Sequence, residues 1–370
     1  MAAKAGCSTW RNTWIPRRSG STRTDRSPGA PARAGIQAGA GGSPCRKTAG
    51  GGPEGRAPDR AGPGTLQGTR ARTRRNHMHV GIIGVGLMGH GIARNVLGRG
   101  GFPLSFLDHP GNQPVDEITG LGATPCATPA EVAAVSDVII LCVTGSPQVE
   151  AIVSGKDGLV EALKPGAVVV DCSTALPEST QRMGEIVAKA GAHYLDAPMT
   201  RTATHAHAGT LNLLVGGEAE VLEQVRPVLA SFTEAVEHVG PLGHGHRMKL
   251  LHNYVSVGFM TLLAEAAAQA ADAGVDPQAF VNVLATGGGA SAALDRLAPY
   301  ITEGNRDALP FAVANAQKDI DYYRAMSEAA GAQQTIADGI SSALSATVEA
   351  GHAQAYVPEL VKFFRKLPKT

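Results

Sequence analysis

Four polar side chains in one predicted helix have the types and the spacing for acid–base chemistry. They are Lys249, His252, Asn253 and Ser256. Their spacing of i, i+3, i+4 and i+7 places them on one face of an α-helix, about 100° wide. A lysine that is partly removed from water has a lowered pKa and can deliver or remove a proton near neutral pH. The pattern predicts a catalytic lysine with polar neighbours, and the alternative is a solvated helix face.

A glycine-rich loop predicts a dinucleotide site. Gly84-x-Gly86-x-x-Gly89 follows an apolar run and opens a helical pattern, and Asp108 ends the next apolar run. In such a loop the glycines allow a tight turn and a close approach of the backbone to a pyrophosphate, while helix N–H groups face the anion. The acidic residue accepts hydrogen bonds from ribose hydroxyls and repels a 2′-phosphate. The loop therefore predicts NAD, with NADP less favoured, and a glycine turn without a ligand is the alternative.

The elements around this loop indicate a parallel sheet with crossover helices. Short apolar runs alternate with helical stretches, and their near-continuous apolarity indicates burial on both faces. The predicted strands are residues 79–85, 103–108, 137–143, 167–173, 193–198, 210–217 and 235–240. We expect an α/β Rossmann-type dinucleotide-binding domain over residues 78–243.

After Pro241 the pattern is helical throughout. The first predicted helix, residues 247–274, carries the polar stripe and would be about 40 Å long at 1.5 Å per residue. Such a helix is long enough to leave one domain and enter the next, and its other side chains near the stripe are mostly apolar. We expect an all-α substrate and oligomerisation domain over residues 244–370, joined by this long interdomain helix, with the stripe facing a cleft.

Residues 1–77 have a different composition from the rest of the chain. They are rich in Gly, Pro, Ala and Arg and carry 15 Lys and Arg against 3 Asp and Glu, whereas residues 78–370 carry 18 against 29. With so few large apolar residues, disorder is the expectation for this leader. Its three possible origins are a misplaced translation start, an organelle transit peptide and a nucleic-acid-binding tail. We prefer the first, because Met78 directly precedes the first predicted strand.

Charge and cysteine content narrow the class of protein. The acidic balance of residues 78–370 argues against nucleic-acid binding. No apolar run reaches the ~18 residues of a membrane span. The five cysteines include no C-x-x-C pair, so neither a disulfide framework nor a zinc knuckle is indicated. We expect a small-molecule partner, no nucleic acid or membrane partner, and a reducing cytoplasmic location.

From Met78 onward the sequence resembles the β-hydroxyacid dehydrogenases, the family of 3-hydroxyisobutyrate dehydrogenase and tartronate semialdehyde reductase. The resemblance rests on five ordered motifs: GIIGVGLMGHGIARNVL, DCSTALPEST, DAPMTRTATHAHAGTLNLLVGG, GHGHRMKLLHNY and QKDIDYY. It implies an NAD-dependent oxidoreductase that interconverts a short 3-hydroxy acid and its aldehyde, and a homodimer or homotetramer.

The resemblance also implies a role for individual residues. Lys249 would be the catalytic acid/base that protonates the carbonyl oxygen during reduction, and Asn253 would hydrogen-bond the substrate beside it. The implied substrate-binding residues are Ser173, Thr200, Arg201, Thr202, His252 and Ser256. The implied cofactor-binding residues are Gly84, Gly86, Leu87, Met88, Gly89, Asp108, Val143, Thr174 and, from the helical domain, Lys318.

The substrate loop departs from the family pattern. Most members read D-x-P-x-S-G-G, whereas residues 196–202 read DAPMTRT, so Arg201 replaces a glycine. A forked, charged donor suits a larger or doubly charged anion, and a similar R-T pair occurs in sulfolactaldehyde reductases. We therefore favour an anionic aldehyde such as 3-sulfolactaldehyde, with 3-hydroxyisobutyrate dehydrogenase and tartronate semialdehyde reductase activities as alternatives. Arg201 could equally form a surface salt bridge, and His252 could pair with an anion or hydrogen-bond within the cleft.

Two further readings are discounted, and a non-catalytic one is kept as an alternative. The histidines at 205, 207, 244, 246 and 252 share no spacing with an acidic or thiolate partner, so we expect no metal site. Cys172 has no neighbouring base and is expected to be an inert buried thiol. A catalytically silent scaffold with a dehydrogenase fold would be expected to lack Lys249, so its presence with Asn253 favours an enzyme.

Overall fold

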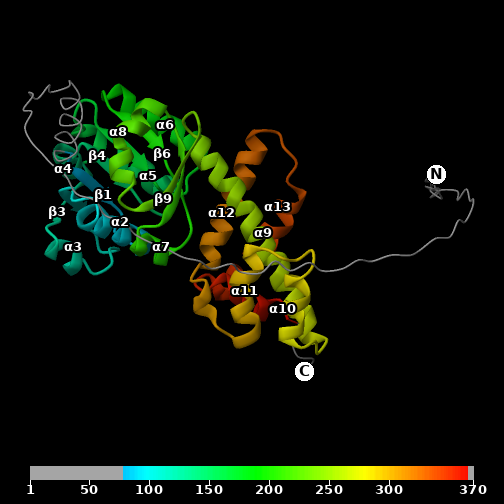
Figure 1. Cartoon of the computed structure of the whole chain (residues 1–370). Helices are drawn as coiled ribbons and strands as arrows, with labels where there is room; N and C mark the ends of the chain where they lie inside the picture. Colours follow the sequence, from blue (N-terminus) through cyan, green and yellow to red (C-terminus); the bar gives the residue numbers. More distant parts are fainter. Residues whose placement is uncertain (1–77, 366–370) are drawn as a thin grey trace, which may run out of the picture. The chain divides into compact units, whose positions relative to one another are not determined.

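The computed structural model describes residues 78–365 (Figure 1). The prediction of a disordered leader over residues 1–77 lies outside the described residues. Within residues 78–365, an α/β part with a mixed sheet is followed by a helical part, so the predicted fold class is confirmed. None of the helices in this range combines the length and the apolarity that a membrane span needs.

A nine-stranded sheet forms the first part of the structure. Its order is β3-β2-β1-β4-β5-β6-β8-β7, with β9 paired to β8. The strands are β1 Val80–Ile83, β2 Leu104–Leu107, β3 Thr124–Cys126, β4 Val138–Leu141, β5 Val168–Asp171, β6 His193–Asp196, β7 Met199–Thr200, β8 Leu211–Gly216 and β9 Thr233–Gly240. Strand β1 pairs in parallel with both β2 and β4, so the strand order reverses beside it. In open α/β sheets a ligand binds outside the carboxyl ends of the strands at this switch point.

Helices cover both faces of the sheet. Ile82 and Ile83 are adjacent in β1, yet Ile82 belongs to the apolar cluster with α2 and α8, and Ile83 to the one with α4, α5 and α6. Successive strand residues point to opposite faces, which explains the continuous apolar runs in the sequence. The helices of this part are α2 Leu87–Gly98, α3 Asp116–Gly120, α4 Pro129–Val135, α5 Ser146–Ser154, α6 Pro177–Lys189, α7 Ala203–Ala208 and α8 Ala219–Leu229, with the short 3₁₀ turn η1 Leu159–Glu161.

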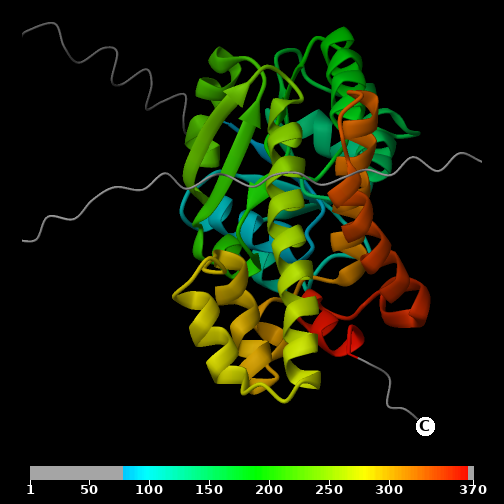
Figure 2. The same cartoon turned by 90° about the vertical axis from the view of Figure 1, so that its right-hand side faces the viewer.

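A 29-residue helix, α9 His244–Asp272, joins the two parts. At 1.5 Å per residue it is about 43 Å long. Figure 2 shows it passing beside strands of the sheet and continuing among the C-terminal helices. Its first turn packs on β6 and β8, and its later turns pack on α11, α12 and α14. The long interdomain helix is confirmed, although it begins three residues earlier and ends two residues earlier than the predicted 247–274.

The second part is helical and has a separate apolar core. This core combines Val257 and Met260 of α9 with Leu294 and Leu297 of α11 and with residues of α12, α13 and the C-terminal segment. The helices are α10 Pro277–Ala285, α11 Ala292–Glu303, α12 Val313–Ala329, α13 Thr335–Thr347 and α14 Leu360–Phe363, with the short turns η2 Arg306–Ala308, η3 Val348–His352 and η4 Val357–Glu359.

The strand predictions differ from the structure mainly at the edge of the sheet. The seven predicted strands are all present; six are two or three residues shorter than predicted, and β9 is two residues longer. Strands β3 and β7 were not predicted from the sequence. Strand β3 is mostly exposed and contains Pro125, so it has no apolar run, and β7 has only two residues. Proline has no N–H to donate to a neighbouring strand. It is tolerated at an edge because there one side of the strand has no neighbour that needs this donor.

Candidate active site

The glycine loop lies between β1 and α2, at the switch point of the sheet. Gly84 has φ +98°, and a Cβ there would collide with the Cys142 carbonyl oxygen. A Cβ on Gly89 would collide with the Gly84 carbonyl oxygen. Around Gly86, in contrast, no atom lies within 4 Å of the position of a Cβ. The first and third glycines are therefore required by packing, and the second leaves an open space beside the backbone.

This open space fits the pyrophosphate of a dinucleotide. No side chain caps α2 at Gly86, so N–H groups of its first turn are available to an anion. Leu87 is 61% exposed in that turn, and Met88 is partly buried against the core of the sheet. The residues predicted to hold the cofactor at this loop thus lie around one cradle that a side chain at Gly86 would fill.

Asp108 lies beside the same loop, at the end of β2. Its side chain is exposed, and within residues 78–365 no hydrogen bond or ion pair engages its carboxylate. The segment that follows is fastened to the glycine loop. The Asn112 side chain donates to the Leu107 carbonyl at 2.9 Å and accepts from the Val85 N–H at 3.3 Å. This role of Asn112 was not predicted from the sequence, because a single asparagine in a polar loop has no distinguishing pattern.

The carboxyl ends of β4 and β5 bring Val143, Ser173 and Thr174 together. The Ser173 hydroxyl accepts a hydrogen bond from the Val143 N–H at 3.1 Å and is buried. Its O–H remains available to donate. Thr174 is partly buried and follows Ser173 directly. Parallel strands end at the same edge of a sheet, which is why residues 30 positions apart in the sequence meet here.

Lys249 is partly buried one turn after the start of α9. Burial lowers its pKa from 10.5 to about 8, the charge of Asp319 acts in the opposite direction, and the charges of Lys318 and Arg296 lower the pKa further. At this pKa both protonation states are populated near neutral pH. A lysine in this state can donate a proton and take it back.

Asn253 is held in one orientation by its neighbours. Its amide N–H donates to Asp319 Oδ2 at 2.6 Å, and its amide oxygen lies 3.0 Å from Nδ1 of His252. Because an amide oxygen only accepts, Nδ1 of His252 carries a proton. Burial lowers the pKa of His252, and Lys249 and Arg296 lower it further, which favours the neutral ring. Ser256 is turned toward its own helix, 3.4 Å from the Asn253 carbonyl oxygen.

Helix α12 meets the sheet edge through Lys318 and Tyr322. Lys318 Nζ donates to the Thr144 carbonyl oxygen at 2.7 Å and lies 3.0 Å from Asp319 Oδ1. One turn later, the Tyr322 hydroxyl accepts from the Ser146 N–H at 3.2 Å. Lys318 therefore stands next to the end of β4, as the cofactor prediction requires of a residue from the helical part. Asp319 was not predicted, since nothing in the sequence brings α12 to α9.

Comparison with known proteins identifies the family. Residues 79–240 match the family model described as the NAD binding domain of 6-phosphogluconate dehydrogenase, and residues 243–364 match the one described as NAD-binding of NADP-dependent 3-hydroxyisobutyrate dehydrogenase. The 2-(hydroxymethyl)glutarate dehydrogenase of Eubacterium barkeri is 33% identical over 227 residues, which cover 61% of this chain and 75% of that protein. The chain belongs to the β-hydroxyacid dehydrogenase family. The resemblance stated from the sequence is confirmed.

Other relatives extend the comparison. The 3-sulfolactaldehyde reductase of Escherichia coli is 35% identical over 188 residues, 51% of this chain and 62% of that protein. The structure of Mycobacterium tuberculosis 3-hydroxyisobutyrate dehydrogenase with L-serine shares the fold, with a TM-score of 0.70 at 24% identity over 78% of this chain and 99% of that chain. Structures with this fold hold NADP⁺ or NAD⁺, so the fold accommodates either cofactor. β-Hydroxyacid dehydrogenases are oxidoreductases of hydroxy acids and their aldehydes.

The predicted substrate loop of this member of the β-hydroxyacid dehydrogenase family has an unusual backbone at Arg201. Arg201 has φ +78°, a left-handed backbone conformation that glycine adopts more readily than other residues. Its guanidinium donates to the Thr210 carbonyl at 2.7 Å and pairs with Glu234 on β9. Of the two roles that the sequence left open for Arg201, the structure contains the salt bridge. Thr200 is partly buried in β7, and Thr202 Oγ1 lies 2.9 Å from Nδ1 of His205.

Arg296 on α11 is a third residue, after Asn112 and Asp319, that was not predicted from the sequence. It is partly buried, its charge acts on both Lys249 and His252, and within the part of the chain that the structure describes no carboxylate forms an ion pair with it. An arginine among apolar helix residues has no distinguishing spacing in the sequence. In the fold it adds an unneutralised positive charge beside the lysine.

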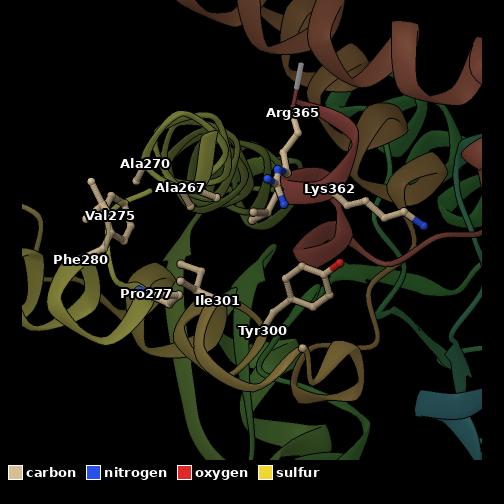
Figure 3. A pocket seen from close by; sticks show the side chains of 12 residues that line it. Ala267, Ala270, Val275, Pro277, Phe280, Tyr300, Ile301, Lys362 and Arg365 are labelled. Carbon is tan, nitrogen blue, oxygen red and sulfur yellow. The ribbon is translucent and has the colours of Figure 1, made fainter. Parts of the chain in front are cut away.

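The Cys172 thiol and the cavity drawn in Figure 3 do not belong to this site. Burial raises the pKa of Cys172 well above its ordinary value, and the neighbouring Cys142 and Asp171 raise it further, so the thiol stays protonated. The cavity in Figure 3, about 400 Å³, is lined by α10, α11, α14 and the far end of α9, with Arg365 at its edge paired to Asp272 at 2.9 Å. Its first α9 residue, Ala267, lies about 27 Å along the helix from Lys249.

Proposed function

We propose that this protein interconverts a short 3-hydroxy acid and the corresponding aldehyde by hydride transfer, with Lys249 as the acid/base. The observation that carries the proposal is Lys249 itself, partly buried, with a pKa of about 8, beside an asparagine that Asp319 orients. A catalytically silent scaffold requires neither a lysine with a lowered pKa nor an oriented amide beside it. Family membership supports the same chemistry.

The residues of this chain would handle the proton and the orientation of the substrate. NAD, when bound at the glycine loop, supplies or accepts the hydride. During reduction Lys249 donates its proton to the carbonyl oxygen, and its positive charge stabilises the negative charge that develops there. During oxidation the neutral lysine removes the hydroxyl proton. Asn253 donates one amide proton to Asp319 and has a second one with which to hold the reacting oxygen.

We propose NAD as the preferred cofactor because of Asp108. Its exposed carboxylate lies beside the glycine loop without a cationic partner in the described residues, so it can accept both ribose hydroxyls and would repel a 2′-phosphate. Replacement with asparagine is expected to lower kcat/KM for NADH and raise it for NADPH, narrowing the preference at least tenfold. Asp116→Asn, an exposed change on α3, is the control. An unchanged ratio for Asp108→Asn would contradict the assignment.

We propose an acid group as the second feature of the substrate. The charges that act on Lys249 are those of two further cations, Lys318 and Arg296, and of a single carboxylate, that of Asp319. The resulting positive charge favours an anionic substrate. Arg296 is the stronger candidate for binding it, because Glu234 already neutralises Arg201. Aldehydes of 3-hydroxy acids, including methylmalonate semialdehyde and tartronate semialdehyde, meet this requirement.

A sulfonate substrate, 3-sulfolactaldehyde, is the second candidate. It is favoured by the Arg201–Thr202 pair and by the similarity to a 3-sulfolactaldehyde reductase. This substrate would require Arg201 to exchange Glu234 for the sulfonate. Glu234 is more than half exposed, so water can take the place of Arg201 as its partner when the guanidinium turns away.

The decisive experiment is NADH oxidation by the full chain with methylmalonate, tartronate and succinic semialdehydes and 3-sulfolactaldehyde. Lys249→Met is expected to lower kcat about 10²–10⁴-fold while NADH still binds. Lys189→Met, an exposed lysine at the end of α6, is the matched control. If Lys249→Met keeps its turnover, the acid/base role of Lys249 fails. If the wild-type protein binds NADH and reduces no aldehyde, the scaffold alternative stands.

The substrate class follows from the same assay. A preference for carboxylate aldehydes that Arg201→Gly leaves unchanged supports the first candidate. A preference for 3-sulfolactaldehyde that Arg201→Gly abolishes supports the second and assigns Arg201 as the anion-binding residue.

We further propose that the protein is a homo-oligomer in which α9 contacts a second copy. Five apolar side chains on α9 are 41–64% exposed: Met248, Leu251, Val255, Phe259 and Leu262. Their spacing of three and four residues forms one stripe, centred about 120° around the helix from Lys249. Phe259→Glu is expected to convert the oligomer to monomer in light scattering, whereas Val283→Glu, an exposed apolar position on α10, is not. A monomeric wild type would contradict the proposal.

The three cysteines of the described residues are free thiols. They support the proposal of a reducing, cytoplasmic location.

A further inference from the structure

His246 is a fully buried histidine in the first turn of α9, one turn before Lys249. Its Nε2 lies 3.1 Å from the Ser173 carbonyl oxygen, and its Nδ1 lies 2.7 Å from the Thr180 hydroxyl. A carbonyl oxygen only accepts, so Nε2 carries a proton and donates. One ring therefore joins the start of α9 to the end of β5 and to α6.

Two buried carboxylates complete the environment of His246. Asp196 accepts from the backbone N–H groups of Gly243 at 2.8 Å and of His246 at 2.7 Å. Asp171 accepts from the Ser173 N–H at 2.9 Å and from the Tyr194 hydroxyl at 3.0 Å. The Nε2 atom of His246 lies 3.9 Å from Asp171 Oδ2, and Nδ1 lies 3.8 Å from Asp196 Oδ2. At these distances neither carboxylate is a hydrogen-bond partner of the ring. Tyr194 stays protonated, because burial and Asp171 raise its pKa.

The contacts of His246 lead to residues of the proposed site. Ser173, whose carbonyl the ring holds, also accepts from Val143 at the end of β4 through its hydroxyl. On the other side, Lys249 follows His246 by three residues in the same helix and so moves with it. A polar side chain in a fully buried position lowers stability unless it is hydrogen-bonded, and here both ring nitrogens are used.

We propose that His246 is a positioning residue, which fixes the first turn of α9 against the end of β5 through its Nε2 hydrogen bond and so aligns Lys249 with Ser173. The inference rests on the proposed function, because it assumes that Lys249 and Ser173 act on the same substrate. Loss of the Nε2 bond frees the helix start from the strand end while leaving the cofactor loop in place.

Two amide substitutions separate the two ring contacts. The amide nitrogen of glutamine occupies a position similar to Nε2, so His246→Gln can still donate to the Ser173 carbonyl. The asparagine amide reaches only as far as Nδ1, so His246→Asn keeps the Thr180 side and loses the Ser173 bond. Thr180→Val removes the Nδ1 partner and leaves the Nε2 bond intact, and it supplies a further comparison where the asparagine variant is unstable.

The expected result is a kcat within about threefold of wild type for His246→Gln and Thr180→Val, and a kcat at least tenfold lower for His246→Asn. NADH affinity is expected to change less than about threefold in all three. The midpoint of the pH–rate profile for oxidation, near pH 8 in the wild type, is expected to move upward in His246→Asn, because a less constrained Lys249 is better hydrated.

Equal losses of kcat in the glutamine and asparagine variants would overturn the proposal. So would a His246→Asn variant that unfolds at lower temperature yet keeps its kcat and its pH profile, since that is the behaviour of a residue with a packing role alone. The result for Lys249→Met distinguishes a failure of the proposed function from a failure of the positioning role of His246. If that variant is active, the proposed function has failed; if it is inactive and the His246 variants do not differ, only the positioning role has failed.

Discussion

Asn253 donates a 2.6 Å hydrogen bond to Asp319, and this bond joins the helix that carries Lys249 to α12. Both residues are buried, and the same carboxylate lies 3.0 Å from Lys318 Nζ. Asp319 therefore has two effects: it orients the amide, and its charge raises the pKa of Lys249 against the lowering caused by burial.

Asp319→Asn is expected to lower the midpoint of the pH–rate profile for oxidation. Removing the negative charge disfavours the protonated lysine, so the pKa of Lys249 falls below about 8. The measurement is kcat/KM against pH with the preferred hydroxy acid. Asp338→Asn, a half-exposed carboxylate that pairs with Arg324, is the control and should leave the midpoint unchanged. A midpoint that stays or rises in Asp319→Asn would show that this carboxylate does not act on the lysine.

Lys249→Met is expected to stabilise the fold at pH 7. The lysine has a lower pKa in the folded state, about 8, than its ordinary 10.5, so the unfolded chain binds more protons between these values. Stability of the wild type therefore rises with pH between about 8 and 10.5, and below pH 8 the full cost of holding the lysine remains. That cost is at most about 3 kcal/mol, and a gain of about 1–3 kcal/mol is expected.

Urea unfolding of Lys249→Met and wild type at pH 7 and at pH 10 tests this prediction. The difference in free energy of unfolding should shrink at the higher pH. Lys189→Met should show no such dependence. A Lys249→Met variant that is less stable than wild type by the same amount at both pH values contradicts the assigned pKa.

Gly86→Ala and Gly89→Ala are expected to fail in different ways. A Cβ at residue 86 meets open space, so the alanine variant should keep its unfolding temperature and bind NADH at least tenfold more weakly, since the methyl group occupies the cradle. A Cβ at residue 89 meets the Gly84 carbonyl, so that variant should lose roughly 1–3 kcal/mol of stability. Thermal unfolding and NADH fluorescence titration separate the two. Unchanged NADH affinity in Gly86→Ala would mean that the cofactor lies elsewhere.

Arg296→Gln is expected to raise KM for a carboxylate aldehyde about 10- to 100-fold, the effect of losing a charged hydrogen bond of about 1.5–3 kcal/mol. Arg201→Gln should change KM for the same substrate less than about threefold, because Glu234 already pairs with Arg201. Steady-state kinetics of both variants decide between the two arginines. The opposite ranking would assign the acid group to the substrate loop.

The sequence predicted those parts of the molecule whose determinants are local. The glycine loop, the buried strands and the long helix each follow from spacing within a few residues, so periodicity and glycine positions were sufficient. The pairing of Arg201 with Glu234, 33 residues away, and the bond from Asn253 to Asp319, 66 residues away, depend on how the elements pack. His246 was considered only as a metal ligand, since its partners Ser173 and Thr180 lie more than 60 residues earlier.

Lys318 and Asp319 are neighbours in the chain, yet Lys318 binds the loop after β4 and Asp319 binds the helix of Lys249. A single turn of α12 thus contacts both halves of the proposed site. A movement that separates the helical part from the sheet would break the Lys318 bond to Thr144, and Lys318 is also the ion-pair partner of Asp319. In the proposed reaction this shared contact would couple product release to the charge that acts on Lys249, so a substitution in α12 that speeds release should also shift the midpoint of the pH–rate profile.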